Sequence, residues 1–547
     1  MSLQKICEVG NHTFTLSDAD IEAYKKFGFE PLNICFPHQH QWRLNFRNDR
    51  FLYRRKCDLT GENIISMYQP SAQFPVYSRE VWFSDRFDPI EYGRSFDFSK
   101  PFFEQFAELK KVTPHMALGN VGSINSEYCN MCVYNKNCYL IFGGDRNEDS
   151  MYGSLPMYCR NCYDCDWTTQ SELCYFSAYS EHCYSSRFIF NCKNCYDCGF
   201  CENLIGCNNC ILSFNLRNKS YYIENKPYTK EEFEKLKRQF IDGSFLTQRK
   251  LWEYFLKLRA SRAVKYANIL NCENCSGDMI FNSKNCRNCF ECIGNEDCRD
   301  CYTIFKSKDC FNSDYVGHKC VLSYNNIACD TAYRAWNSWW TIESSDIDYS
   351  IASNYSKNLF GCIGAKHNEY CIFNKQYSKE DFSALKEKII AHMKRTGEWG
   401  RFFPKSISPF PYNESTSNYF FPLKKEEALA AGFRWRDPEI AANAQVYKIP
   451  DNINSTPDSI ANEILVCKSS KRNFRILPQE FSFYKSQNIP IPREHPDARF
   501  YKRLALRNPF KLFERKCAKC AISLKTTYAP ERTETIYCEK CYLQKLY

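Results

Sequence analysis

The sequence predicts a mainly β protein: a cysteine-rich parallel β-solenoid in two blocks with helical inserts, flanked by duplicated zinc-ribbon-like α+β end modules. Three observations predict this class. Cysteines recur at multiples of three, the chain contains two internal duplications, and two C-x2-C motifs stand near the carboxy terminus. With 547 residues, the chain is long enough to bury several separate cores.

The two ends of the chain are copies of one module. A shift of 460 positions aligns residues 1–81 with residues 461–541 without a gap. The matches include Cys7 with Cys467, Tyr24 with Tyr484, Arg43-Leu44 with Arg503-Leu504, and Arg55-Lys56-Cys57 with Arg515-Lys516-Cys517. The alignment predicts a degenerate zinc-ribbon-like module over residues 1–81, a connector over 82–128 and a basic zinc-ribbon module over 461–547.

Cysteine is the outlier of the composition, with 34 residues. Fourteen lie between Cys129 and Cys210, and twelve between Cys272 and Cys371. Several pairs are 21 residues apart, such as Cys138 and Cys159, and a coil of about twenty residues is usual in a parallel β-solenoid. We predict solenoid blocks over residues 129–228 and 271–377, with Asn in the turns because Asn tolerates left-handed backbone.

Three roles are open for the block cysteines. Small, readily buried thiols can pack the interior of a solenoid. The C-x2-C steps can instead bind structural zinc. Cys192, Cys195, Cys198 and Cys201 also resemble a ferredoxin-type run, although the last spacing is two rather than three and no proline follows. Packing is the interpretation that we favour.

A second duplication, at an offset of 149, closes each cysteine block with a capped helix. Thr229 with Glu232, and Ser378 with Asp381, have the N-cap and N3 spacing ahead of an apolar rhythm. This pattern predicts a helical insert over residues 229–270 and a helix over 378–400. The segment that follows is rich in Pro, Ser and Asn, which indicates a linker over 401–460.

The carboxy-terminal module carries the spacing of a zinc ribbon. Cys517-x2-Cys520 and Cys538-x2-Cys541 form two knuckles, each of which gives two thiolates to one tetrahedral ion. Because all four ligands are protein sulfur, no position stays open for water, and the predicted Zn is structural rather than catalytic. The amino-terminal equivalents are Cys57, Thr60, Ser78 and Val81, so we expect that copy to keep its shape without metal.

A second candidate metal site lies at the amino terminus. Cys7, Cys35 and His38, with His12 or His40 nearby, can form another pair of zinc knuckles. The alternative is an ordinary buried Cys with surface His. The other copy has Cys467, His495 and Ala498 at the matching positions, which cannot complete such a site.

Positive charge gathers at the carboxy terminus. Residues 461–547 hold 18 Lys or Arg against 8 Asp or Glu, a surplus of 10 that equals the net charge of the whole chain. The pattern predicts an exposed cationic helix face that contacts a phosphate backbone, with a solvated surface as the alternative. The predicted contact residues are Arg499, Lys502, Arg503, Arg507, Lys511, Arg515 and Lys516, and in the other copy Arg43, Arg47, Arg50, Arg54 and Arg55.

Taken with their order, these motifs resemble a family of long, cysteine-rich zinc-ribbon proteins found in metagenomic genomes of small bacteria. The resemblance rests on Arg55-Lys56-Cys57, on the segment from Tyr92 to Phe106, on the Asn-Cys runs and on Arg515-Lys516-Cys517-Ala518-Lys519-Cys520. It covers most of the chain, but the family supplies no activity to transfer. Members of this family look similar to one another at the amino-terminal knuckles, which are more complete than those of this chain.

We expect a non-enzymatic, zinc-binding scaffold that associates with nucleic acid, most plausibly RNA or a ribonucleoprotein. The alternative is a solenoid that assembles with itself or with other proteins, and the third hypothesis is a carbohydrate-active solenoid enzyme, although no acid pair stands out. The amino terminus lacks the apolar core of a signal peptide, and no stretch is apolar enough for a membrane span. We therefore expect a cytoplasmic protein. No small-molecule substrate is evident from the sequence.

Overall fold

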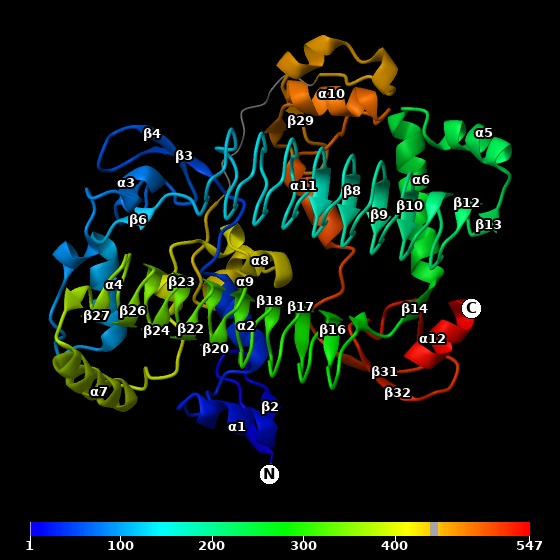
Figure 1. Cartoon of the computed structure of the whole chain (residues 1–547). Helices are drawn as coiled ribbons and strands as arrows, with labels where there is room; N and C mark the ends of the chain where they lie inside the picture. Colours follow the sequence, from blue (N-terminus) through cyan, green and yellow to red (C-terminus); the bar gives the residue numbers. More distant parts are fainter. Residues whose placement is uncertain (1, 438–446, 547) are drawn as a thin grey trace.

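A computed structural model describes residues 2–437 and 447–546 of the chain. It confirms a mainly β protein with parallel sheets, in which two stacks of short strands run side by side (Figure 1). The first stack forms one sheet of β7 (Tyr163–Asp166), β8 (Tyr175–Ala178), β9 (Arg187–Phe190), β10 (Gly199–Glu202), β11 (Asn208–Ile211), β12 (Ser220–Ile223) and β13 (Lys226–Pro227). Block 1 below means this stack with the coils that precede it from Val121.

The second stack, block 2, contains two sheets. The larger is formed by β15 (Ile269–Leu270), β16 (Gly277–Phe281), β17 (Cys289–Ile293), β18 (Tyr302–Phe305), β19 (Asp314–Val316), β21 (Ile327–Asp330), β23 (Trp339–Ile342) and β25 (Ile351–Asn354). The smaller is formed by β20 (Val321–Tyr324), β22 (Tyr333–Trp336), β24 (Ser345–Asp348), β26 (Lys357–Phe360), β27 (Glu369–Ile372) and β28 (Lys375–Gln376). In both blocks the last strand turns back antiparallel to its neighbour.

The register of these strands corrects the predicted coil of about twenty residues. In block 1 each paired residue lies beside the residue twelve positions further on, as Tyr163 does beside Tyr175. Block 2 repeats this step, apart from eleven residues between β15 and β16 and thirteen between β19 and β21. The coil is therefore twelve residues long. The spacing of 21 misled because every third residue faces inward, so any multiple of three joins two inward positions.

The interior of the blocks is lined by the cysteines. All fourteen cysteines of block 1 are buried, and in block 2 only Cys272 and Cys275 of the twelve are partly exposed. Most of these thiols donate to carbonyls of their own and the next coil, as Cys159 Sγ does to Met157 O (3.5 Å) and Thr168 O (3.2 Å). Among the described residues, no block cysteine belongs to a cluster of three or more candidate metal ligands, and none forms a disulfide. These contacts agree with packing cysteines.

Asparagine occupies many of the corners between the three-residue sides, alongside Tyr, Leu, Phe and Asp. Corner residues adopt positive φ, which Asn tolerates better than most side chains. Asn191 and Asn194, for example, have φ of 53° and 52°. Their side chains also bond along the stack, as when Asn203 Nδ2 donates to Asn215 Oδ1 at 2.8 Å. The corners thus explain why Asn so often precedes Cys in the sequence.

The two end modules repeat each other residue for residue. In the amino-terminal copy the elements are β1 (Leu3–Ile6), β2 (Thr13–Leu16), α1 (Asp18–Lys26), α2 (Phe36–Leu44), β3 (Tyr53–Lys56), β4 (Asn63–Ser66), β5 (Val76–Tyr77) and α3 (Arg79–Phe83). In the carboxy-terminal copy they are β29 (Leu465–Val466), β30 (Asn473–Phe474), α10 (Pro478–Ser486), α11 (Pro496–Leu504), β31 (Phe513–Lys516), β32 (Ser523–Thr526), β33 (Thr535–Tyr537) and α12 (Glu539–Leu546). Four of these pairs have bounds that differ by 460 at both ends.

Each end module contacts both blocks (Figure 1). In the amino-terminal module α2 packs on β19 of block 2, while β5 pairs with β6 (His115–Met116), which leads into block 1. In the carboxy-terminal module α11 packs on β7 of block 1, while β33 pairs with β14 (Ala263–Lys265), which leads into block 2. The partners β6 and β14 are themselves related by the offset of 149. The modules therefore bridge the two blocks in a pseudo-twofold arrangement.

The remaining helical elements pack around the blocks and the end modules. These elements are η1 (Pro89–Tyr92), α4 (Phe102–Val112), α5 (Lys230–Phe240), α6 (Phe245–Ser261), α7 (Lys379–Arg395), η2 (Lys405–Ile407), η3 (Tyr412–Glu414), α8 (Ser417–Phe420), α9 (Lys425–Ala430), η4 (Ile453–Ser455) and η5 (Asp458–Asn462). The predicted caps are confirmed, because Thr229 Oγ1 and Ser378 Oγ accept from the N3 backbone of α5 and α7. Within the segment predicted as a linker, the aromatic residues Phe402, Phe403 and Phe410 instead pack into the core, and residues 438–446 lie outside the described part of the chain.

Candidate metal centres and buried arginine clusters

The carboxy-terminal knuckles bring four thiols together. Cys517 follows β31, Cys520 precedes β32, Cys538 follows β33, and Cys541 lies in α12; their sulfur atoms are all within 4.8 Å of one another. Backbone N–H groups point at the sulfurs, because Cys538 N donates to Cys517 Sγ at 3.3 Å and Cys541 N to Cys538 Sγ at 3.5 Å. Although burial opposes ionisation, backbone hydrogen bonds from Cys520, Cys538 and Lys519 lower the pKa of Cys517 to about 6. The set can hold a metal ion.

The amino-terminal module assembles a second set, with Cys7, His12, Cys35 and His38 as its members. His38 Nδ1 lies 3.2 Å from Cys7 Sγ and 3.3 Å from Cys35 Sγ. His12, rather than His40, is the fourth member. His40 is buried elsewhere, with Nδ1 2.5 Å from Asp314 Oδ1.

Gly10 forms the wall of this second set. A Cβ at position 10 would lie 2.4 Å from His38 Cε1 and 2.6 Å from His12 Nδ1, distances that real Cβ atoms do not show. The absence of a side chain at Gly10 therefore leaves both imidazoles room to face Cys7 and Cys35. A side chain at position 10 would have to displace both imidazoles.

Each module has one of the two candidate metal sites. At the position of the other site it keeps a similar backbone but lacks most of the ligands. In the amino-terminal copy, Ser78 N donates to Cys57 Sγ at 3.4 Å, as Cys538 N does to Cys517. Ser78 Oγ then accepts from Val81 N and caps α3, in place of a metal ligand. In the other copy the His495 ring accepts from Asp497 N and caps α11. Each copy thus carries four candidate ligands, and the two sets occupy different positions of the duplicated module.

Part of the predicted cationic face of the carboxy-terminal module is buried, so the expectation of an exposed stripe is wrong for Arg499 and Arg503. Helix α11 ends at Leu504, and Arg499 and Arg503 are 3% and 2% exposed. Arg503 Nε lies 2.6 Å from Asp166 Oδ2 and its Nη1 lies 2.8 Å from Asp164 Oδ1, both on β7. Arg499 binds Asp164 as well, at 3.0 Å. These arginines dock α11 on block 1 instead of facing solvent.

The amino-terminal copy uses its arginines in the same way. Arg43 Nε lies 2.6 Å from Asp314 Oδ2 on β19, and its side chain is 1% exposed. Arg47 pairs with Asp49 and lies over the Tyr315 ring. Arg50 is also buried and pairs with Asp497 of the other module at 3.2 Å. Arg43 and Arg503 are equivalent in the duplication, and each anchors its module to the block that is remote in sequence.

The other predicted contact residues lie nearer the surface. Arg54 is exposed and donates to Tyr128 Oη, whereas Arg55 pairs with Asp58. Lys502 is exposed and pairs with Glu494 at 2.6 Å. Arg515 donates to Ala529 O, while Lys511 and Lys516 are exposed. Only part of the predicted cationic face is therefore open to a partner.

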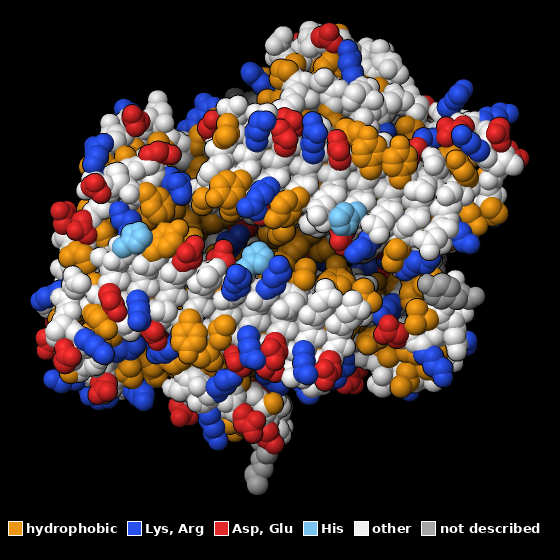
Figure 2. All heavy atoms as spheres, in the orientation of Figure 1, with side chains coloured by type: hydrophobic (Ala, Val, Ile, Leu, Met, Phe, Trp, Pro, Cys, Tyr) orange, Lys and Arg blue, Asp and Glu red, His pale blue; other side chains and the backbone are white. Residues whose placement is uncertain are grey.

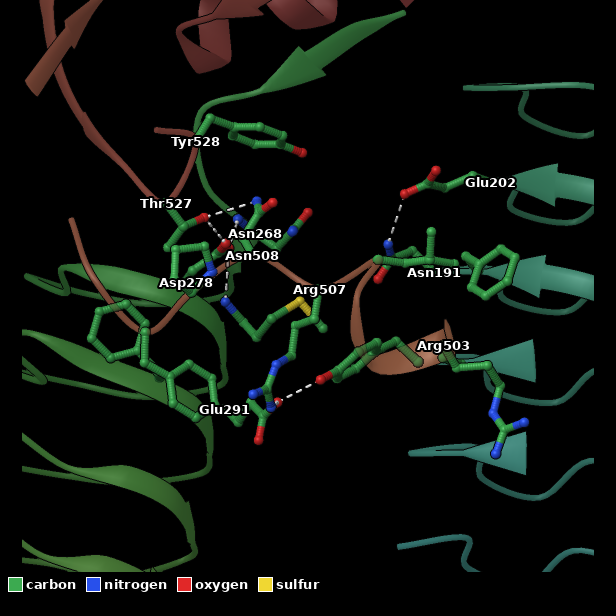
Figure 3. Close-up of a pocket in the computed structure, with 18 of the residues that line it drawn as sticks. Asn191, Glu202, Asn268, Asp278, Glu291, Arg503, Arg507, Asn508, Thr527 and Tyr528 are labelled. Atoms are coloured by element: carbon green, nitrogen blue, oxygen red, sulfur yellow. Dashed lines mark hydrogen bonds and ion pairs between the residues drawn. The ribbon is translucent and has the colours of Figure 1, made fainter. Parts of the chain in front are cut away.

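Arg507 points into a small cavity between the two blocks (Figure 3). Its Nη1 lies 3.1 Å from Glu291 Oε1 of block 2, and Tyr179 of block 1 donates its Oη to the same carboxylate. Figure 3 shows Arg503 directed away from this cavity. The cavity has about 60 Å³, which is room for a few water molecules rather than a substrate. The network therefore joins the blocks.

Two features of the structure were not predicted from the sequence. The first is the set of carboxylates that receive the arginines, such as Asp164 and Asp314; acidic residues inside a buried Tyr-Asp-Cys-Asp strand were the available signal. The second is an exposed ladder in which Arg146 lies 5.1 Å from the Tyr134 ring centroid and 5.6 Å from that of Tyr158. A twelve-residue period would have shown it.

Charged side chains form further ladders on the surface. Lys136 with Glu148, and Lys308 with Glu296, pair across neighbouring coils at 2.8 and 3.1 Å. Figure 2 shows rows of alternating charge over both blocks. Such exposed pairs contribute little to stability, and they leave each row nearly neutral.

Comparison with protein-family models gives no match, and comparison with curated proteins gives none either. Among the described residues, no helix combines the length and the apolar composition needed to cross a bilayer.

Proposed function

We propose that the protein is a zinc-stabilised scaffold, in which two β-solenoids of twelve-residue coils are clamped together by zinc-ribbon-like end modules. The observation that carries this proposal is the double attachment of each module. One half docks through a buried arginine, Arg43 or Arg503, on one block, and the other half pairs in parallel with the strand that leads into the other block. A molecule so organised presents two long repetitive surfaces at a fixed mutual position.

Zinc is the proposed ion at both centres. Four thiolates at Cys517, Cys520, Cys538 and Cys541, and two thiolates with two imidazoles in the amino-terminal set, are the ligand sets that structural zinc prefers. Each set is complete with protein atoms, so the ion would have no open position for substrate. Its role would be to fix the loop that carries each knuckle.

The proposed partner is nucleic acid, most plausibly RNA. With the arginines buried, the support for this partner comes from lysines on the carboxy-terminal knuckles. Lys519 and Lys540 lie between the paired cysteines, Lys516 immediately precedes them, and all three are exposed. No carboxylate of the described residues forms an ion pair with any of the three. Ammonium groups of this kind can contact a phosphate backbone.

Fluorescence anisotropy with a labelled structured RNA tests this partner. Replacing Lys516, Lys519 and Lys540 with Gln removes three possible contacts, so the slope of log affinity against log salt should become shallower by about two units. The matched control replaces three exposed lysines of α7, Lys379, Lys388 and Lys394, and should leave the slope unchanged. Equal behaviour of the two triple variants would contradict a specific contact at the knuckles.

A second candidate is a scaffold for proteins, and exposed tyrosines favour it. Tyr184 and Tyr196 stack on neighbouring coils with ring centroids 5.3 Å apart, and they are 39% and 49% exposed. Rigid exposed aromatics are common at protein interfaces. Sedimentation velocity of the wild type and of Tyr184→Ser/Tyr196→Ser tests self-association: a concentration-dependent oligomer that the variant loses supports this candidate, and a monomer throughout excludes self-assembly through this face.

A further inference from the structure

A cavity of about 580 Å³ lies where the amino-terminal module, α4 and the aromatic segment after α7 meet. Its volume is in the range of small-molecule sites. The cavity is separate from both metal centres and from the space around Arg507. Its lining residues include Gln69, Ser71, Phe74, Lys110, Ser408 and Arg434.

Lys110 is the unusual residue of this lining. Its side chain belongs to α4 and the residue is 7% exposed, whereas Lys111 next to it is exposed. The Lys110 ammonium lies 4.3 Å from the centroid of the Phe74 ring. No carboxylate among residues 2–437 and 447–546 forms an ion pair with it. A buried ammonium without a counter-charge is costly, and proteins usually pair such groups.

The surroundings of Lys110 add positive charge and donors. Arg434 is exposed, lines the same cavity and donates to Ser408 O. Burial first, and the charge of Arg434 second, lower the pKa of Lys110 to about 7. A bound anion would reverse both effects, because it would supply the missing counter-charge. The hydroxyl of Ser71 and the amide of Gln69 lie in the same lining and offer further donors.

The apolar part of the lining indicates that a ligand would carry an apolar group beside its anionic group. Phe74 and Trp435 both line the cavity, and aromatic side chains contact flat apolar groups well. We propose that this cavity binds a small organic anion, with its carboxylate or phosphate group on Lys110 and Arg434 and its apolar body against Phe74 and Trp435. The shared chemistry is an oxyanion attached to a ring-sized apolar group.

Isothermal titration calorimetry of the full-length protein tests the proposal with phenyl phosphate, benzoate and inorganic phosphate as probes. We expect one of the two aromatic probes to bind at least tenfold more tightly than inorganic phosphate. Lys110→Met should weaken that binding at least tenfold. The control Lys388→Met changes an exposed lysine of α7 that does not line the cavity, and it should weaken that binding less than twofold. If no aromatic probe binds, or if both variants lose affinity equally, the proposal is wrong.

A second measurement uses the unmutated protein, so it does not depend on the folding of a variant. Acylation of amines by a low concentration of an N-hydroxysuccinimide ester is followed residue by residue by mass spectrometry. A saturating aromatic probe should slow the labelling of Lys110 at least fivefold and leave Lys388, on the exposed surface of α7, unchanged. Identical labelling of Lys110 with and without a probe that binds would place the probe elsewhere and overturn the assignment.

Discussion

Replacing Arg503 with Gln should destabilise the protein strongly. Arg503 is fully buried and makes three contacts, to Asp166 at 2.6 Å, to Asp164 at 2.8 Å and to Tyr152 O at 3.2 Å. The variant leaves Asp166 without its cation and leaves Asp164, which has no access to solvent, with Arg499 alone. Breaking a buried pair in this way costs about 3 to 5 kcal/mol. The expected result is a lower midpoint of urea unfolding, measured by tryptophan fluorescence and circular dichroism.

Lys502→Gln is the matched control, because Lys502 is the neighbouring cation of α11 and its side chain is 50% exposed. Its effect on the free energy of unfolding should stay within about 0.5 kcal/mol. Under conditions where Arg503→Gln is folded, its affinity for RNA should equal that of the wild type. A variant that is as stable as the wild type but loses RNA binding would show that Arg503 faces a partner, and would refute the docking role.

Three other predictions follow from the structure. Gly10→Ala should lower the metal content by one ion per chain, measured by native mass spectrometry, because the added Cβ displaces both imidazoles; unchanged content would contradict the Cys7 and His12 site. Lys110→Met should stabilise the protein most below pH 7, because the folded chain holds the Lys110 proton with a pKa of about 7 and the unfolded chain with one near 10.5. The free energy of unfolding of the wild type therefore increases as the pH rises. The difference in this free energy between Lys110→Met and the wild type, measured by urea unfolding, should shrink by about 2 to 3 kcal/mol between pH 7 and pH 9. A constant difference would contradict the buried charge. Iodoacetamide should label few of the block cysteines until denaturant is added, because burial raises the pKa of thiols such as Cys138 to about 12; fast labelling of most of them in the folded protein would contradict the packed interior.

The duplication of the ends and the first candidate metal centre could be predicted because their signals are local or copied. Cys517 and Cys520 are separated by only two residues. The ungapped repeat of 81 residues identifies which elements of the amino-terminal module correspond to which elements of the carboxy-terminal module. The amino-terminal set was harder, since only the folded loop around Gly10 selects His12 over His40. Spacing alone does not say which of two neighbouring imidazoles turns toward a sulfur.

The burial of the arginines could not be predicted from the sequence. Arg503 and Asp164 are 339 residues apart, and a cation every four residues has the same pattern whether it faces phosphate or a buried carboxylate. The burial of these arginines depends on how the end modules dock on the blocks, and no local sequence pattern gives the position of a module relative to a block. The coil length failed for a different reason. Cys138 and Cys159 share the inward-facing phase of a three-residue period, but that phase says nothing of how many sides close one coil.

Metal stoichiometry under native conditions tests the zinc-stabilised scaffold most directly. Native mass spectrometry of the purified chain should show two zinc ions. Cys517→Ser/Cys538→Ser should retain one, and Cys7→Ser/Cys35→Ser should retain the other, because the two sets share no ligand. A wild-type chain that carries no zinc, or double variants that keep both ions, would contradict the proposal that these knuckles are the zinc sites that hold the end modules in shape.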